Sequence, residues 1–158
     1  MAKNIHTAEI YTDGSCHTQL RKGAWAAIIF TQLGRQTLTG TEQEATHNRM
    51  ELTAVIKAIE YVQANWPDIT HLDIYTDSQY VTMLPGREHK LTEQGFRTAK
   101  GNERNNTELL KRLLQLSPLF TTAFIKVKAH QKKGGEADYN READMLCRQL
   151  VRESVSGK

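Results

Sequence analysis

"IYTDGSC", residues 10–16, places a carboxylate and a glycine directly after a run of strand-forming residues. The stretch "IYTDSQY", residues 74–80, repeats the pattern later in the chain. An Asp-Gly or Asp-Ser pair on its own is typical of a turn, so either acid alone could simply begin a loop. Two matching stretches are harder to explain by turn preference, and they favour a functional site at the ends of two strands.

The first part of the chain has the pattern of strands. Short connections separate three β-rich segments, which predicts an antiparallel meander over residues 5–12, 23–30 and 35–41. Apolar side chains then recur at three- and four-residue steps, which predicts an amphipathic helix over residues 48–65 that Trp66-Pro67 ends.

The rest of the chain alternates helix and strand patterns. We expect a strand at 71–76, a short helix at 77–84 stopped by Pro85-Gly86, a helix at 106–116, a strand at 121–129, a loop at 132–139 and a closing helix at 140–155. This order predicts an α/β fold whose mixed sheet has an antiparallel start and parallel additions through helical crossovers. The length fits a single domain over residues 1–158.

Composition narrows the classes of partner and compartment. No apolar run is long enough to span a bilayer and the N-terminus lacks a signal core, so we expect a cytoplasmic protein with no membrane partner. The two cysteines, Cys16 and Cys147, have no metal-binding spacing, and we expect free thiols and no zinc. Residues 1–85 carry 6 basic and 9 acidic side chains, whereas residues 86–158 carry 15 and 9. The basic half indicates an anionic partner, of which nucleic acid is the usual one.

Four carboxylates stand out by position. Asp13 and Asp77 each end a predicted strand, Glu51 lies in the first turn of the long helix, and Asp144 lies early in the closing helix. The carboxyl ends of strands are where ligands bind in open α/β sheets. Four like charges there require compensation by hard divalent cations, commonly Mg²⁺. Two such ions can activate water and stabilise the leaving oxygen in phosphodiester cleavage.

Each acid also has a local explanation, which the residues alone leave open. Asp77 could cap the helix that follows it. Glu51 could belong to a capping box that reaches back to the residue-48 amide, with Thr46 or Asn48 as the cap. Asp144 could interact favourably with the dipole of the closing helix.

The motifs "YTDGSC", "NRMEL", "YTDSQYV", "KAH" and "NREAD", in this order, resemble those of the small bacterial type-one class of ribonuclease H. The match spans residues 8 to about 152. The resemblance implies an RNase H-like fold, in which a five-stranded mixed sheet is flanked by helices. It also implies an endoribonuclease that hydrolyses the RNA strand of RNA/DNA hybrids with Mg²⁺ or Mn²⁺, leaving 5′-phosphate and 3′-hydroxyl ends. We expect a monomer.

The resemblance carries roles onto individual residues. It implies that the metal ligands are Asp13, Glu51, Asp77 and Asp144, and that His130 serves proton transfer or product release. It implies minor-groove contacts by Asn48 and Gln79, RNA-strand contacts by Gly14, Ser15 and Cys16, and a DNA-phosphate pocket at Thr46 and Asn106. We expect Gly14 to let a nucleic-acid backbone approach closely. Arg49 could be an ion-pair partner, and Asn140 could support Asp144 or cap its helix.

The sequence departs from the family's pattern at three places. "HTQLRKGAW", residues 17–25, replaces a Gly/Pro-rich turn and predicts a changed first hairpin. Ala129 stands where glycine usually precedes the motif histidine, and the loop after it is longer. Residues 86–105, usually strongly basic, carry only +2, which predicts weaker and more salt-tolerant hybrid binding.

Three other functions share parts of this pattern. A transposase or integrase core usually has three acids and additional DNA-binding domains, and a non-catalytic hybrid-binding module would be expected to have lost an acid. A domain excised from a reverse transcriptase is the remaining alternative. The full set of acids and the "NRMEL" context favour the hybrid-specific endoribonuclease, and the initiator Met and compact domain favour a free-standing protein over an excised domain.

Overall fold

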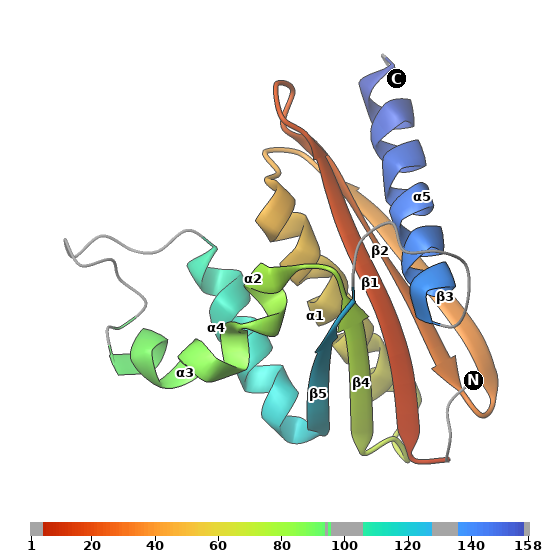
Figure 1. Ribbon diagram of the computed structural model, residues 1–158, viewed down its shortest axis with the longest axis vertical. Coiled ribbons are helices and arrows are strands. Elements are labelled where there is room, and N and C mark those ends of the chain that lie inside the picture. Colours follow the sequence, from red (N-terminus) through yellow and green to blue (C-terminus); the bar gives the residue numbers. More distant parts are fainter. Residues whose placement is uncertain (1–4, 94, 96–105, 128–135, 157–158) are drawn as a thin grey trace.

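The computed structural model describes residues 5–93, 95, 106–127 and 136–156 (Figure 1). In chain order the elements are β1 (Thr7–His17), β2 (Lys22–Thr31), β3 (Gly34–Glu42), α1 (His47–Asn65), β4 (His71–Thr76), α2 (Gln79–Thr82), α3 (Leu84–Glu93), α4 (Thr107–Leu116), a 3₁₀ turn (Ser117–Leu119), β5 (Thr121–Lys126) and α5 (Glu136–Val155). No described helix combines the length with the hydropathy that a bilayer span requires.

The five strands form one mixed sheet in the order β3-β2-β1-β4-β5. β1, β2 and β3 pair antiparallel as successive hairpins. β4 pairs parallel with both β1 and β5, and helical crossovers make these connections. The predicted mixed α/β sheet with an antiparallel start and parallel additions is therefore confirmed.

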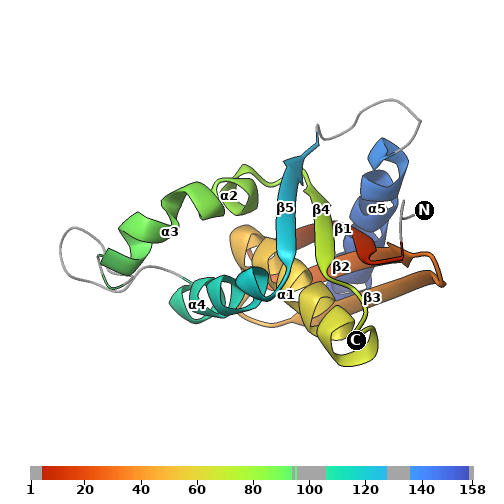
Figure 2. The same ribbon diagram turned by 90° about the horizontal axis from the view of Figure 1, so that it is seen from below.

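Helices cover both faces of the sheet. α1 and α4 lie on one face and α5 lies on the other, as the two views show (Figures 1 and 2). Ile29 of β2 belongs to the core cluster on the α1 side, whereas Ile28 and Phe30 belong to the cluster that includes Cys147 of α5. β2 reads as a continuous apolar run because both of its faces are buried.

Several predicted boundaries are wrong. Pro85 and Gly86 lie in the first turn of α3 and do not stop a helix there, because the missing proline N–H has no intrahelical partner at that position. α5 begins at Glu136, so the part of the expected loop over residues 136–139 is helical. β5 ends at Lys126, and residue 127 lies outside the strand.

Asp13 does not end its strand, contrary to the prediction. β1 continues to His17 because β2 pairs with it throughout, with Asp13 opposite Ala26. The parallel pairing of β1 with β4 stops earlier, at Tyr11 and Tyr75. Asp13 and Asp77 each follow this last pair by two residues, so the two matching sequence stretches are in register at the point where β1 and β4 diverge.

Candidate active site

Three carboxylates meet where β1 and β4 diverge. Asp13, Glu51 and Asp77 each bring one carboxylate oxygen within 4.8 Å of the other two. Asp13 is 5% exposed and Glu51 is 1% exposed, whereas Asp77 is half-buried. The structure therefore brings together the two strand acids and the helix acid that the sequence singled out.

Gly14 allows α1 to approach β1 closely enough to deliver Glu51. A Cβ at Gly14 would lie 2.6 Å from both the Glu51 nitrogen and the Met50 carbonyl carbon. Any side chain there would clash with the helix backbone. The packing of α1 against β1 is therefore enough to require glycine here, and the close approach of a nucleic-acid backbone to Gly14 stays a prediction.

The capping explanations for two of the acids are also wrong. Thr46 is the N-cap of α1, and its side chain accepts a hydrogen bond from the Arg49 amide at 3.2 Å. Glu51 therefore lies beyond the capping-box position. Ser78 caps α2 by accepting a hydrogen bond from a backbone amide, so Asp77 precedes the cap. Neither acid has a role at a helix terminus.

Asp144 lies beside the three clustered acids. It is the ninth residue of α5, too far from the helix N-terminus to interact strongly with its dipole. Its carboxylate accepts a hydrogen bond from Arg148 Nε at 3.1 Å. Its negative charge also contributes to raising the pKa of Asp13.

Burial and mutual repulsion hold protons on this cluster. Burial first, and then the charges of Glu51, Asp77 and Asp144, raise the pKa of Asp13 to about 10. Burial also raises the pKa of Glu51 to about 7, against a lowering effect from His47. Both groups bind protons more tightly than ordinary carboxyls, as expected of acids that are buried beside other acids.

His47 contacts the helix acid from one turn away. Its Nε2 atom lies 3.4 Å from Glu51 Oε2, and this contact raises the pKa of His47. Glu51 Oε1 is buried and has no hydrogen-bond partner. An unpartnered carboxylate oxygen among other carboxylates suits a hard divalent cation, so the residues present fit a Mg²⁺ or Mn²⁺ site.

Two side chains of α5 donate hydrogen bonds to the backbone of the strands next to the cluster. Asn140 Nδ2 donates to the backbone oxygen of Thr12 at 3.4 Å and to the backbone oxygen of Tyr75 at 3.3 Å. Asn140 therefore bridges β1 and β4 where their pairing stops, and as the fifth residue of α5 it does not cap that helix. The buried Cys147 Sγ donates to the Asp13 backbone oxygen at 3.3 Å, and burial raises the pKa of its thiol.

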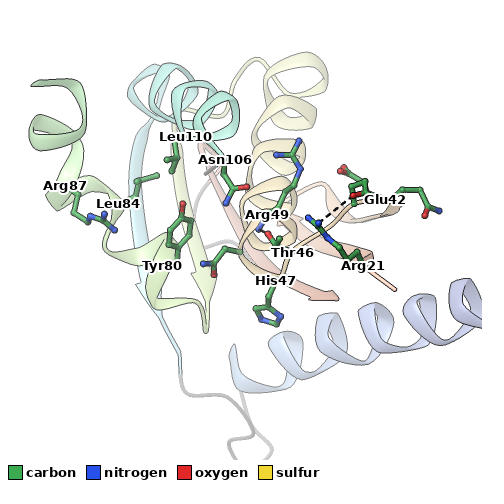
Figure 3. Close-up of a pocket in the computed structure, with 13 residues that line it drawn as sticks. Arg21, Glu42, Thr46, His47, Arg49, Tyr80, Leu84, Arg87, Asn106 and Leu110 are labelled. Carbon is green, nitrogen blue, oxygen red and sulfur yellow. Dashed lines mark hydrogen bonds and ion pairs between the residues drawn. The ribbon is translucent and has the colours of Figure 1, made fainter. Parts of the chain in front are cut away.

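A groove of about 820 Å³ adjoins the cluster (Figure 3). Three predicted substrate contacts, Thr46, Asn48 and Asn106, line it. Arg49 lines it too and pairs with Glu108 at 2.6 Å, so the ion-pair role considered for Arg49 is present. His47 lines the groove and also contacts Glu51, so the groove lies next to the acid cluster, although none of the four acids lines it.

The other predicted contacts lie elsewhere. Ser15 and Cys16 are half-buried on β1 after Asp13 and Gly14. Gln79 is exposed at the start of α2, where its amide contacts Met83 Sδ at 3.3 Å. His130 lies outside the described residues.

Sequence reasoning missed His47 and Arg21 among the residues that line the groove. His47 precedes Glu51 by one helical turn, and that spacing could have identified it. Arg21 also lines the groove, although it lies 25 residues before Thr46 in the chain. No sequence signal indicates its position, because the conformation of the hairpin places it there.

Comparison with known proteins gives consistent matches over nearly the whole chain. Residues 6–152 match the family model for RNase H. A ribonuclease H of Prosthecochloris aestuarii is 36% identical over 146 residues, which cover 90% of this chain and 94% of the relative. A ribonuclease H of Ehrlichia chaffeensis is 36% identical over 156 residues, which cover 96% of this chain and all of the relative.

Solved structures share the fold at lower identity. LC9-RNase H1, a type 1 RNase H with the type 2 active-site motif, has a TM-score of 0.78 at 19% identity, covering 97% of this chain and 75% of that one. The foamy viral protease-reverse transcriptase in complex with RNA/DNA hybrid has a TM-score of 0.75 at 17% identity, covering 93% of this chain and 20% of that one. At these identities the likeness establishes the common architecture.

Proposed function

The chain belongs to the ribonuclease H family, and we propose that it hydrolyses the RNA strand of RNA/DNA hybrids, leaving 5′-phosphate and 3′-hydroxyl ends. The observation that carries this proposal is the cluster of Asp13, Glu51 and Asp77, each of which brings one carboxylate oxygen within 4.8 Å of the other two. His47 connects this cluster to the neighbouring groove. Buried carboxylates that crowd one another in this way are suited to bind a hard divalent cation.

The ligands in this proposal are Asp13, Glu51, Asp77 and Asp144. Two Mg²⁺ ions, or Mn²⁺ in their place, supply an activated water and stabilise the leaving oxygen when bound. His47 contacts Oε2 of Glu51, and Oε1 of the same carboxylate has no hydrogen-bond partner. Asn140 fixes the two strands from which Asp13 and Asp77 project. His130 is proposed to transfer a proton or assist product release.

The substrate contacts are proposed in two groups. Thr46 and Asn106, which line the groove of the protein, are assigned to a phosphate of the DNA strand, and Asn48 and Gln79 to the minor groove of the hybrid. Gly14, Ser15 and Cys16 on β1 are assigned to the RNA strand. Such contacts distinguish a hybrid by its shape and by the 2′-hydroxyl of its RNA strand. The monomeric state, the cytoplasmic location and the single domain over residues 1–158 stay predictions.

A cleavage assay tests the function. The protein is incubated with Mg²⁺ and an RNA/DNA hybrid, the matching all-DNA duplex or the matching all-RNA duplex. We expect cleavage of the hybrid's RNA strand alone, and no cleavage by Asp13→Asn. Asp73→Asn is the matched control, because Asp73 is a half-buried acid of β4 that is not one of the three clustered ligands. Cleavage of all-DNA, or an active Asp13→Asn, would contradict the proposal.

A further inference from the structure

Backbone strain concentrates on the groove. Among the described non-glycine residues, three have a positive φ: Arg21 at 56°, Glu44 at 52° and Asn106 at 66°. All three line the groove that adjoins the acid cluster. Non-glycine residues adopt this conformation at an energetic cost, and such residues gather at functional sites. Asn106 already has a proposed substrate role, whereas Arg21 and Glu44 have none.

The backbone of Arg21 is anchored on both sides. Its amide donates to the His17 oxygen at 2.7 Å, and its own oxygen accepts from the Ala45 amide at 2.7 Å. These bonds tie the β1–β2 hairpin to the segment just before α1. Neither bond uses a side chain, and glycine would adopt the same φ without strain. The fold therefore does not require an arginine here, and the guanidinium is the feature to explain.

The Arg21 side chain is held loosely in the free protein. Its guanidinium lies 3.7 Å from Glu44 Oε1, and the side chains are 52% and 82% exposed. An exposed ion pair of this kind contributes little stability and exchanges readily for a stronger partner. Arg49, by contrast, is already engaged by Glu108 at 2.6 Å.

Arg21 extends the reach of the groove toward the first hairpin. Arg21 and Arg87 lie at opposite ends, with the N-terminus of α1 between them (Figure 3). A duplex whose scissile strand meets the acids would present phosphates of its backbone along this line. Arginine can donate two parallel N–H bonds to one phosphate. The 3.7 Å contact between Arg21 and Glu44 is longer and weaker than such a pair of hydrogen bonds.

We propose that Arg21 binds a backbone phosphate of the hybrid and releases Glu44 when it does so. Glu44 keeps the guanidinium over the groove in the free protein and competes with the phosphate for it. This inference rests on the proposed function, since it takes the hybrid as the ligand. It adds a cationic contact from the hairpin segment "HTQLRKGAW" to the contacts proposed at Thr46 and Asn106.

The test measures hybrid binding against salt concentration in the Asp13→Asn background, with Mg²⁺ present and cleavage blocked. Arg21→Gly removes the guanidinium and suits the backbone, so its urea unfolding midpoint should match that of the parent. We expect binding weaker by about three- to tenfold, and a slope of log K against log salt that is lower by about 1. Arg21→Lys should restore the slope and part of the affinity.

Lys57→Ala is the matched control, because Lys57 is an exposed cation of α1 that lines a different hollow. It should change the affinity less than twofold and leave the slope unchanged. Glu44→Gln should tighten binding about twofold, because the competing carboxylate is lost. Weaker binding by Glu44→Gln would overturn the proposal that Arg21 releases Glu44 when it binds the phosphate.

The failure of this inference differs from the failure of the proposed function. If the parent binds the hybrid and Arg21→Gly retains the same slope, Arg21 makes no phosphate contact and the inference is overturned alone. If wild-type protein neither binds nor cleaves the hybrid, the proposed function fails and the inference fails with it.

Discussion

Gly14→Ala tests whether the close approach of α1 to β1 sets the geometry of the acids. The added Cβ would lie 2.6 Å from the Glu51 nitrogen and 2.8 Å from the Met50 Cβ. Ordinary contact begins at 3.4 Å, so the start of α1 must retreat by about 0.8 Å. Overpacking of this kind costs about 1–3 kcal/mol of unfolding free energy. A displacement near 1 Å at a catalytic group lowers the rate by about 100-fold.

Two measurements separate these effects. Urea unfolding gives the loss of stability, and the hybrid cleavage rate at saturating Mg²⁺, per folded molecule, gives the effect of moving Glu51. Gly86→Ala is the control, since no atom lies within 4 Å of a Cβ at this position in α3. Unchanged stability and rate in Gly14→Ala would refute the reasoning. Lost stability with an unchanged rate would show that Glu51 tolerates displacement.

Two further predictions concern the cluster and its support. The pKa values of Asp13 and Glu51 are raised in the folded state, so in metal-free protein these two groups should stabilise the fold most below about pH 4, and their contribution should fall as pH rises from about 4 to about 10. Asp13→Asn should flatten this dependence in thermal unfolding with EDTA, and parallel curves for the two proteins would contradict it. Asn140→Ala should cost about 1–3 kcal/mol in urea unfolding because two strand carbonyls lose a donor. Asn140→Asp should cost at least as much, and a variant as stable as wild type would exclude the bridging role.

The sequence predicted the parts of the site that depend on strand register. "IYTDGSC" and "IYTDSQY" share three residues before the acid, and parallel pairing of Tyr11 with Tyr75 places both acids at the same level. A periodic helix after the meander then delivers Glu51 from α1. These features follow from local residue patterns and from the order of strands and helices, and both can be inferred from a sequence.

The features that the sequence did not reveal depend on tertiary context. The end of β1 was misplaced because pairing with β2 outlasts pairing with β4, and only the folded sheet shows the difference. The role of Gly14 follows from the position of the α1 backbone. The left-handed conformations of Arg21 and Glu44 break local preference, so propensity rules do not anticipate them.

The carboxylates of the cluster repel one another, and contacts from α5 hold the strands that carry them in place. Asp13 and Glu51 are buried beside like charges, and an unsupported cluster would relieve this repulsion by spreading apart. Asn140 and Cys147 oppose spreading from α5, since one bridges β1 to β4 and the other donates to the backbone of Asp13. The protein's own contacts therefore fix the strands that carry the carboxylates, which lowers the cost of assembling the site when a cation binds. A preformed site of this kind trades stability of the metal-free protein for catalytic geometry.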